Sequence, residues 1–275
     1  MDDGEKQNFD IELYRQVWQR LNKSKILSNS PSNLQPIPLY VFECLTSTNT
    51  KVWELIDTDI TIPVGAIALQ QTAGKGQWGH SWVSARGGLY LSLALNVDLD
   101  TNKNLHLVMA TAWGIAKALR YYQLPVKIKW SNDLILDEKK LGGIKIETRN
   151  IKNKIVQAVV GVGINWRNPV PNVGINLESY YASQTSIVIN SLEELTAIAS
   201  YGIILGYQYY LSKGIEKLLT EYTAISNSIG KQIIIDNYAG EVIGINSDGK
   251  LEIILRSPGA VTKIAFTPEQ ISLGY

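Results

Sequence analysis

Hydrophobic and polar positions repeat along the chain with two different periods, which predicts a mixture of helices and strands. Residues 11–27 place apolar side chains three or four positions apart, a spacing typical of one amphipathic helix. A polar, proline-containing connector follows, with the sequence SPSNLQPIP. Because only about one helix fits before position 39, this part of the chain leaves no room for a helix-turn-helix domain.

From Leu39 onward, apolar runs typical of strands alternate with helical patterns. The predicted strands cover 41–45, 64–70, 89–97, 126–130, 134–136, 143–148 and 155–166. The predicted helices cover 48–56, 104–122 and 191–222, and a loop region covers 168–190.

The pattern changes after Tyr222, where only short β-rich runs remain. Asp248-Gly249 and Ser257-Pro258-Gly259 mark tight turns between these runs. Four or five short strands predict a small SH3-like barrel. We therefore divide the chain into an N-terminal helix with its connector, a central domain and a C-terminal domain, at residues 1–38, 39–226 and 227–275.

Composition narrows the class of protein. The 275 residues carry 26 Lys+Arg and 25 Asp+Glu, a net charge of +1, so net charge does not favour a nucleic-acid partner. Cys44 is the single cysteine, which excludes an intramolecular disulfide and fits a reducing compartment. The N-terminus MDDGEKQNFD is no signal peptide, and the uncharged stretch 195–212 is too polar for a membrane span. We expect a soluble, cytoplasmic protein without a membrane partner.

A glycine-rich segment, QTAGKGQWGHSW at 71–82, is the first candidate for chemistry. Such a loop can wrap a ligand closely with its backbone N–H groups. Lys75 is a cation for an anionic ligand, and two tryptophans provide apolar cover. The segment matches neither the P-loop pattern nor a dinucleotide-binding GxGxxG turn, which disfavours both classes.

The segment KWSNDLILDEKKLGGIKIE at 129–147 is the second candidate. Lys129 ends one predicted strand and Lys140 precedes a Gly-Gly pair, so both lysines can face a phosphate or a carboxylate. Asp133 can orient a lysine, a ribose or a magnesium ion. A solvated, charged hairpin explains the same residues equally well.

Two shorter segments complete the set. GVGINW at 161–166 places glycines at alternate positions of an apolar strand, where a ligand or a helix packs against the backbone. STNTK at 47–51 follows a strand, where its residues can cap a helix or bind a ligand. His80 and His106 are the two histidines, and no metal-ligand spacing exists; we expect His106 to be structural.

These four segments, in this order, resemble the motifs of biotin protein ligases, the biotin–acetyl-CoA-carboxylase ligases. The resemblance covers about residues 40–275 and is to the type that lacks an N-terminal DNA-binding domain. It implies an α+β fold: a mixed sheet with flanking helices, related to class II aminoacyl-tRNA synthetases, followed by the SH3-like barrel. It also implies no nucleic-acid partner and allows a homodimer.

The resemblance implies a two-step reaction. Biotin reacts with ATP, carried with Mg²⁺, to give biotinyl-5′-AMP and pyrophosphate. A lysine of a carrier protein, the biotin carboxyl carrier protein of acetyl-CoA carboxylase, then takes the biotinyl group. The glycine-rich loop should close over the adenylate and exclude water.

The resemblance also assigns site residues. The implied catalytic residues are Lys140, Lys129, Asp133 and Lys75. The implied biotin-binding residues are Ser47, Thr48, Asn49, Gln71, Gly74, Trp82, Gly88, Leu89, Lys140, Gly142, Gly143, Gly161 and Gly163. The implied ATP-binding residues are Lys75, Gly76, Gln77, Trp78, Gly79, Lys129, Asn132 and Asn165. No metal is held by the protein alone; Mg²⁺ arrives with ATP, and Asp133 is its candidate protein ligand.

The chain departs from the family pattern at several positions. Gln77 and Trp78 stand where basic residues are usual, and Lys75 replaces an arginine, which removes a bidentate fork for phosphate. Ser131 replaces a proline, and Trp166 replaces a smaller residue. These changes bear on how well the adenylate is retained.

Three other functions compete with this interpretation. A lipoate or octanoate ligase shares the implied fold, but usually carries an R-R-x-S-G-G-G segment where this chain has GKGQWG. A non-catalytic biotin sensor would not need the lysines and the aspartate of the second segment. An adaptor that binds proline-rich peptides would need an aromatic groove, and residues 229–275 offer few aromatic side chains.

Overall fold

A seven-stranded mixed sheet is the largest part of the computed structural model, which describes residues 9–24, 26, 34–235, 237–257 and 259–274. Its strand order is β1-β2-β3-β7-β6-β5-β4. The strands are β1 (Leu39–Phe42), β2 (Val64–Ala68), β3 (Leu89–Asp100), β4 (Lys127–Lys129), β5 (Asp133–Leu136), β6 (Lys139–Ile151) and β7 (Lys154–Ile164). β1 and β2 run parallel and the other neighbours run antiparallel. The predicted mixed sheet with flanking helices is confirmed.

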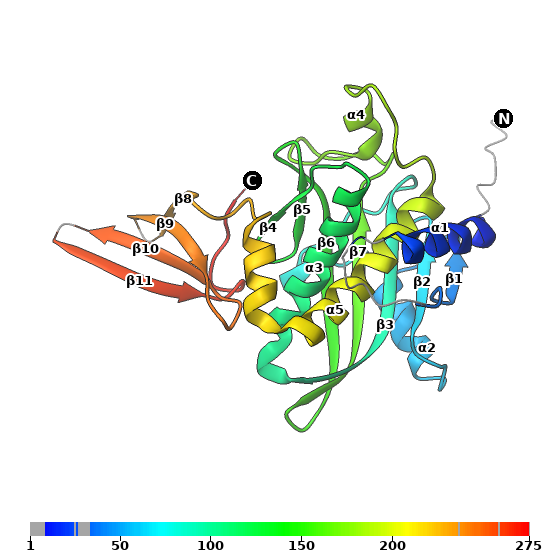
Figure 1. Cartoon of the computed structure of the whole chain (residues 1–275), viewed down its shortest axis with the longest axis horizontal. Helices are drawn as coiled ribbons and strands as arrows, with labels where there is room; N and C mark the ends of the chain where they lie inside the picture. Colours follow the sequence, from blue (N-terminus) through cyan, green and yellow to red (C-terminus); the bar gives the residue numbers. More distant parts are fainter. Residues whose placement is uncertain (1–8, 25, 27–33, 236, 258, 275) are drawn as a thin grey trace.

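Helices cover both faces of this sheet (Figure 1). α2 (Thr48–Ile56) packs on one face, where Val52 and Ile56 join a small apolar cluster with β2, β3 and β7. α3 (Asn104–Tyr121) and α5 (Leu192–Thr223) form layers on the other face, and α1 (Ile11–Lys23) packs on α5. Among the described residues, no helix is long and apolar enough to span a lipid bilayer.

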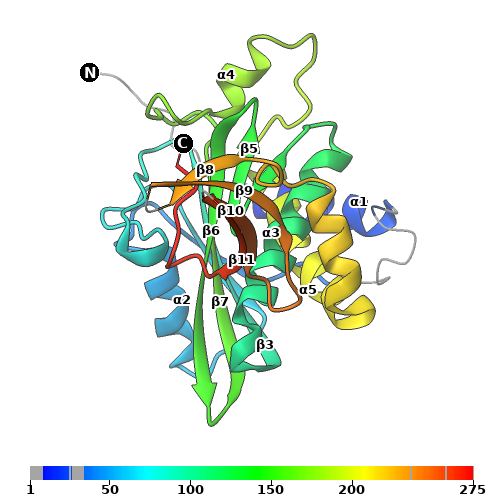
Figure 2. The same cartoon turned by 90° about the vertical axis from the view of Figure 1, so that its left-hand side faces the viewer.

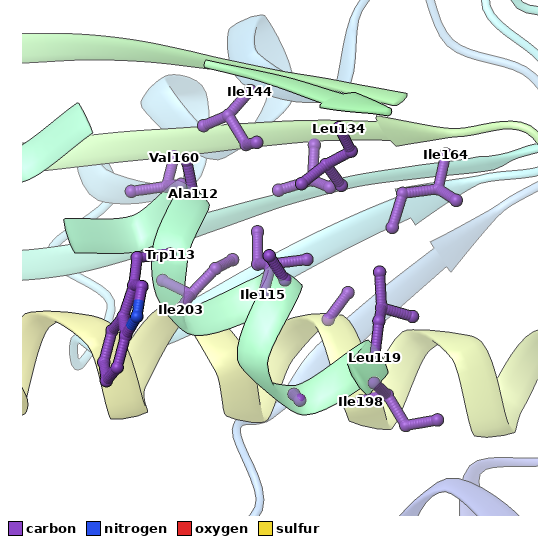
Figure 3. Packing of buried hydrophobic residues seen from close by; sticks show 14 of the residues in the cluster. Ala112, Trp113, Ile115, Leu119, Leu134, Ile144, Val160, Ile164, Ile198 and Ile203 are labelled. Atoms are coloured by element: carbon purple, nitrogen blue, oxygen red, sulfur yellow. The ribbon is translucent and has the colours of Figure 1, made fainter. Parts of the chain in front are cut away.

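The main core lies around α3, which is sandwiched between the sheet and α5 (Figure 3). Ile115 of α3 is fully buried among strand residues such as Val160 and helix residues such as Ile198. α3 and α5 approach so closely that a Cβ atom on Gly114 would lie 2.6 Å from the Gly206 nitrogen. Glycine is therefore required where the two helices cross.

The C-terminal part is a separate antiparallel sheet in the order β11-β10-β9-β8 (Figures 1 and 2). Its strands are β8 (Gln232–Ile235), β9 (Tyr238–Ile245), β10 (Leu251–Ser257) and β11 (Ala260–Phe266). His106 of α3 links α5 and the turn between β9 and β10, because its Nδ1 lies 2.9 Å from the Tyr210 hydroxyl and its Nε2 lies 2.8 Å from the Ser247 carbonyl. His106 is thus a structural residue, as the sequence predicted. The predicted boundary at 226/227 falls between α5 and β8.

Several predicted element bounds were wrong. The helix predicted over 11–27 ends at Lys23, and the strand predicted over 41–45 is β1, which ends at Phe42. The strand predicted over 143–148 is the 13-residue β6, because its polar residues pair with β7 along a long hairpin. The predicted loop 168–190 contains α4 (Leu177–Tyr181), which the Asn176 side chain caps. Inside α5, Gly214 interrupts the helix with a φ of 76°.

Candidate functional site

The four sequence motifs meet in one cleft, a cavity of about 60 Å³ at the face of the large sheet. The N-terminus of α2, the glycine-rich loop before β3, and strands β5, β6 and β7 form its walls. Its described lining residues are Ser47, Thr48, Asn49, Gln71, Lys75, Gly76, Gln77, Trp82, Asn132, Asp133, Lys140, Gly143, Ile144, Lys145, Gly161, Val162 and Gly163. Most of the residues assigned to biotin or ATP by the resemblance are therefore brought together.

The strand wall of the cleft is lined by glycines in register. Gly143 on β6 pairs with Asp133 on β5 and with Gly163 on β7, so these positions form one row across three strands. A Cβ atom on Gly163 would lie 2.6 Å from the Trp82 ring, and one on Gly161 would collide with the Asn49 amide. In this structure the groups against these two glycines are protein side chains. Their contact with biotin stays a prediction.

Thr48, Asn49 and Gln71 line one end of the cleft, and the buried Ser84 and Ser92 bond to them from behind; we call these five residues the amide end. The Gln71 Oε1 accepts from the Thr48 backbone N–H at 2.8 Å, and its Nε2 donates to the Ser84 hydroxyl at 2.8 Å. The Ser92 hydroxyl donates to the Asn49 Oδ1 at 2.6 Å and lies 2.7 Å from the Thr48 hydroxyl. These bonds fix each group in one orientation.

One donor of the amide end has no protein partner. The Asn49 side chain is buried, with 5% of its surface exposed, and among the described residues its Nδ2 has no hydrogen-bond acceptor. A buried N–H group without an acceptor costs roughly 1–3 kcal/mol. The Trp82 Nε1 is likewise buried and has no hydrogen-bond acceptor among the described residues. Both donors belong to residues that line the cleft.

Asp133 and Lys140 form the opposite end of the cleft, and Lys129 lies next to them in the wall of a neighbouring cavity; we call these three residues the charged end. The Lys140 Nζ lies 2.8 Å from the Asp133 Oδ1 and 5.4 Å from the centre of the Trp82 ring. The buried Lys129 ammonium donates to the Gly274 carbonyl. Burial lowers the pKa of Lys129 to about 8, although the Asp133 carboxylate acts in the opposite direction.

The charged end opens into a second cavity of about 530 Å³, which sequence reasoning did not foresee. Its wall combines Lys129, Asp133 and Lys140 with the segment 268–273 that follows the C-terminal sheet. This segment lies at the charged end because the chain turns back toward the large sheet after β11 (Figure 2). No motif in 268–273 indicated such a position.

Other assigned residues lie beside the cleft and do not line it. Asn165 is buried; its Nδ2 donates to the Lys140 carbonyl at 3.3 Å and the Ile175 carbonyl at 3.2 Å. Leu89 is fully buried in the core. A Cβ atom on Gly142 would lie 2.5 Å from the Gly163 carbonyl oxygen, and Gly74 and Gly88 are similarly crowded by protein atoms. These residues support the cleft, and their contacts with ligand stay predictions.

The glycine-rich loop forms the wall of the cleft that faces strands β5, β6 and β7. Lys75 donates to the Thr50 hydroxyl at 3.2 Å, at the start of α2. Gly79 has a φ of 80° and open space around it. The Trp78 side chain lies outside the part of the chain that the structure describes, so its predicted role in covering the ligand is not addressed. Lys145, which the sequence marked only as part of a charged hairpin, lies under this loop.

The described residues hold no group of three or more His, Cys, Asp or Glu side chains that could bind a metal ion. Asp133 is the one carboxylate among the described residues that line the cleft. A single carboxylate fits a magnesium ion that arrives with a nucleotide, because Mg²⁺ usually keeps several waters and few protein ligands.

Comparisons with known proteins agree with this geometry. Residues 41–165 match the Biotin/lipoate A/B protein ligase family. The "Bifunctional ligase/repressor BirA" of Bacillus subtilis (strain 168) is 24% identical over 274 residues, covering 94% of this chain and 84% of that protein.

Solved structures show the same fold. A biotin protein ligase from Aquifex aeolicus in complex with biotin and ATP superposes with a TM-score of 0.66 at 21% identity, covering 82% of this chain and 95% of that one. The biotin protein ligase from Leishmania major in complex with biotinyl-5-AMP gives a TM-score of 0.57 at 19% identity, covering 83% and 99%.

Proposed function

We propose, from the premise that residues 41–165 belong to the biotin/lipoate A/B protein ligase family, that this chain is an ATP-dependent biotin protein ligase. It activates biotin as biotinyl-5′-AMP and transfers the biotinyl group to a lysine of a carrier protein. The relatives named as biotin protein ligases, and the solved relatives that hold biotin with ATP or biotinyl-5-AMP, support this function.

One observation carries the proposal: the cleft has two chemically different ends on one row of strands. The amide end offers fixed hydroxyl and amide groups and the buried Asn49 N–H donor. The charged end offers two lysines and an aspartate. Biotin has the matching chemistry, because its ureido ring carries a carbonyl oxygen and two N–H groups while its chain ends in a carboxylate.

The first step needs positive charge at the charged end. An oxygen of the biotin carboxylate attacks the α-phosphorus of ATP, and the bond from that phosphorus to the bridging oxygen breaks. Pyrophosphate leaves with the bonding electrons. In this proposal Lys140 and Lys129 stabilise the charge that builds on the α-phosphate, and fixed donors of this kind contribute about 10²–10³ in rate. Their ammonium groups are held by Asp133 and by the Gly274 carbonyl.

The second step forms an amide. The ε-amine of the carrier lysine attacks the acyl carbon, the bond from that carbon to the AMP oxygen breaks, and AMP leaves. The attacking nitrogen gives up a proton to solvent. Asp133 is the candidate group to orient this amine, since it lines both the cleft and the larger cavity beside it.

Magnesium belongs to this proposal as the ion that neutralises the phosphates of ATP, with Asp133 as its candidate protein ligand. The biotin carboxyl carrier protein of acetyl-CoA carboxylase is the expected acceptor. The homodimer, the cytoplasmic location and the absence of DNA binding stay predictions from the sequence.

Mass spectrometry of an acceptor tests the function directly. A biotin carboxyl carrier domain is incubated with the chain, biotin, ATP and Mg²⁺, and its acceptor lysine is then examined. We expect one biotinyl group on that lysine, and none without ATP or with lipoate in place of biotin. Lipoylation of the acceptor would assign the chain to the sister activity, and biotin binding without any transfer would make it a sensor.

A further inference from the structure

We propose that Lys145 and Gln77 are positioning residues that latch the glycine-rich loop onto β6 and thereby retain the acyl-adenylate. This inference rests on the proposed function and names two residues of that site which the motifs did not assign to this role. We call the two contacts described next the loop latch.

The loop latch joins consecutive residues of the loop to consecutive residues of β6. The Lys145 Nζ donates to the Gly76 carbonyl at 2.9 Å. The Gln77 Nε2 donates to the Ile144 carbonyl at 3.2 Å, an acceptor that also receives the Asn132 Nδ2 at 2.9 Å. Two bonds to neighbouring positions fix the orientation of the loop as well as its distance from the sheet.

Lys145 is itself held in place from α2. Its Nζ lies 3.5 Å from the Glu147 Oε1, and the Glu147 Oε2 accepts from the Trp53 Nε1 at 2.9 Å. The Lys145 side chain is 22% exposed, and Lys145 pairs with Gly161 in the strand register. The lysine therefore reaches the loop from a rigid strand and is braced by a helix.

The latch gives a physical reason for the neutral residue at position 77. By resemblance a basic residue is usual there. Gln77 bonds to a backbone carbonyl instead, and the cation at this place comes from Lys145 on the strand. Closure of the loop then depends on bonds within the protein rather than on the charge of the adenylate.

The two latch residues also line two neighbouring cavities. Gln77 and Lys145 line both the 60 Å³ cleft and a neighbouring cavity of about 600 Å³, which lies between α3, β6 and the C-terminal sheet. Loss of the bond from Lys145 to the Gly76 carbonyl would free the loop to move away from β6 and admit water beside the acyl-adenylate. Because a mixed anhydride of this kind hydrolyses readily, the expected result is loss of the intermediate.

The test compares Lys145→Met, which keeps the length of the side chain, with Lys145→Arg, which keeps the donor. Lys139→Gln is the matched control, since Lys139 is an exposed lysine on the same strand. Two quantities are measured without acceptor: the escape and hydrolysis of preformed biotinyl-5′-AMP, and hydrogen–deuterium exchange of residues 74–82 in the substrate-free protein.

We expect Lys145→Met to raise the escape of the adenylate about tenfold, as the loss of one charge-assisted hydrogen bond would. The backbone amides of the loop should exchange faster in the same variant. Lys145→Arg should keep adenylate escape and loop exchange near their wild-type values, and the control Lys139→Gln should change each by less than about twofold.

Three results would decide against the latch or against its premise. Unchanged escape and unchanged loop exchange in Lys145→Met would overturn the latch. A higher KM for ATP with unchanged loop exchange would overturn it too, and would make Lys145 a phosphate ligand. If the wild-type protein forms no biotinyl-5′-AMP, the proposed function fails, and faster loop exchange in Lys145→Met would still support the contact itself.

Discussion

The amide end and the charged end of the cleft lie on the same strands but are built in opposite ways. At the amide end, hydroxyls and amides bond to one another in fixed orientations, and the Asn49 donor alone is left without a protein acceptor among the described side chains of this group. At the charged end, an ion pair and a buried ammonium hold charge close to solvent. The amide end is suited to binding a neutral ring, and the charged end is suited to stabilising charge that changes during a reaction.

This difference predicts that the two ends affect different kinetic constants. Groups that bind substrate and transition state equally change KM, whereas groups that act on charge developed in the transition state change kcat. Substitutions at the two ends should therefore be separable by kinetics, and each prediction below tests that separation.

Lys140→Ala should have the largest effect. Its ammonium is the cation paired with Asp133 at the charged end. We expect biotin-dependent ATP–pyrophosphate exchange to fall about 10²–10³-fold in kcat, because a preorganised donor to the developing charge is lost. Lys139→Ala, at the exposed neighbouring lysine, is the control and should stay near wild type. Near-normal ATP–pyrophosphate exchange in Lys140→Ala would show that the Lys140 ammonium does not stabilise the transition state of the first step.

Asn49→Ala should raise the Kd and the KM for biotin about tenfold while leaving kcat nearly unchanged. The reason is the loss of the buried Nδ2 donor, and hydrogen bonds of this class contribute about 1–1.5 kcal/mol. Titration calorimetry with biotin measures the Kd, and Asn150→Ala, at an exposed asparagine of β6, is the control. A fall in kcat without a change in Kd would contradict the division between the two ends.

The pH dependence of kcat/KM for ATP should follow the protonation of Lys129. Burial lowers the pKa of this lysine to about 8, so the free protein loses this positive charge as the pH rises through that value. We expect kcat/KM for ATP to fall above pH 8 by about tenfold per pH unit, since this parameter reports groups of the free enzyme. Lys129→Arg should remove the fall, because arginine stays charged. A flat profile in the wild type would show that the charge of Lys129 is not needed.

Ser84→Ala should have the smallest effect. It removes the acceptor that holds the Gln71 amide at 2.8 Å and leaves the rest of the amide end in place. A neutral hydrogen bond of this kind contributes about 1 kcal/mol at most sites, so the KM for biotin should rise about two- to fivefold. Thr58→Ala, at an exposed threonine beyond α2, is the control. An effect on kcat larger than that of Lys140→Ala would reverse the assignment of the two ends.

The sequence predicted the order of the elements well, because apolar periodicity is a local property. It placed α3 and the C-terminal strands close to their observed positions. It failed on the length of β6, which was predicted over 143–148 but pairs with β7 from Gly142 to Ile151. Pairing between strands is not visible in the composition of one of them.

The site was foreseen as a set of motifs but not as a set of contacts. The four motifs do meet in one cleft, yet the bond from Lys145 to Gly76 joins residues 69 positions apart. For the same reason the sequence did not predict the contacts of Ser92, a single hydroxyl in an apolar strand, or the position of the segment 268–273 at the charged end. Asn165, assigned to the nucleotide, bonds to two backbone carbonyls, which no motif could indicate, and its contact with the nucleotide stays a prediction.

The most direct test of the two-end account is ATP–pyrophosphate exchange in Asn49→Ala and Lys140→Ala as the biotin concentration is raised to saturation. The account predicts that Asn49→Ala regains nearly the wild-type rate at high biotin, because only binding is weakened, while Lys140→Ala stays slow at every concentration. Recovery of Lys140→Ala at high biotin, or a permanent loss in Asn49→Ala, would contradict the separation of binding from charge stabilisation in this cleft.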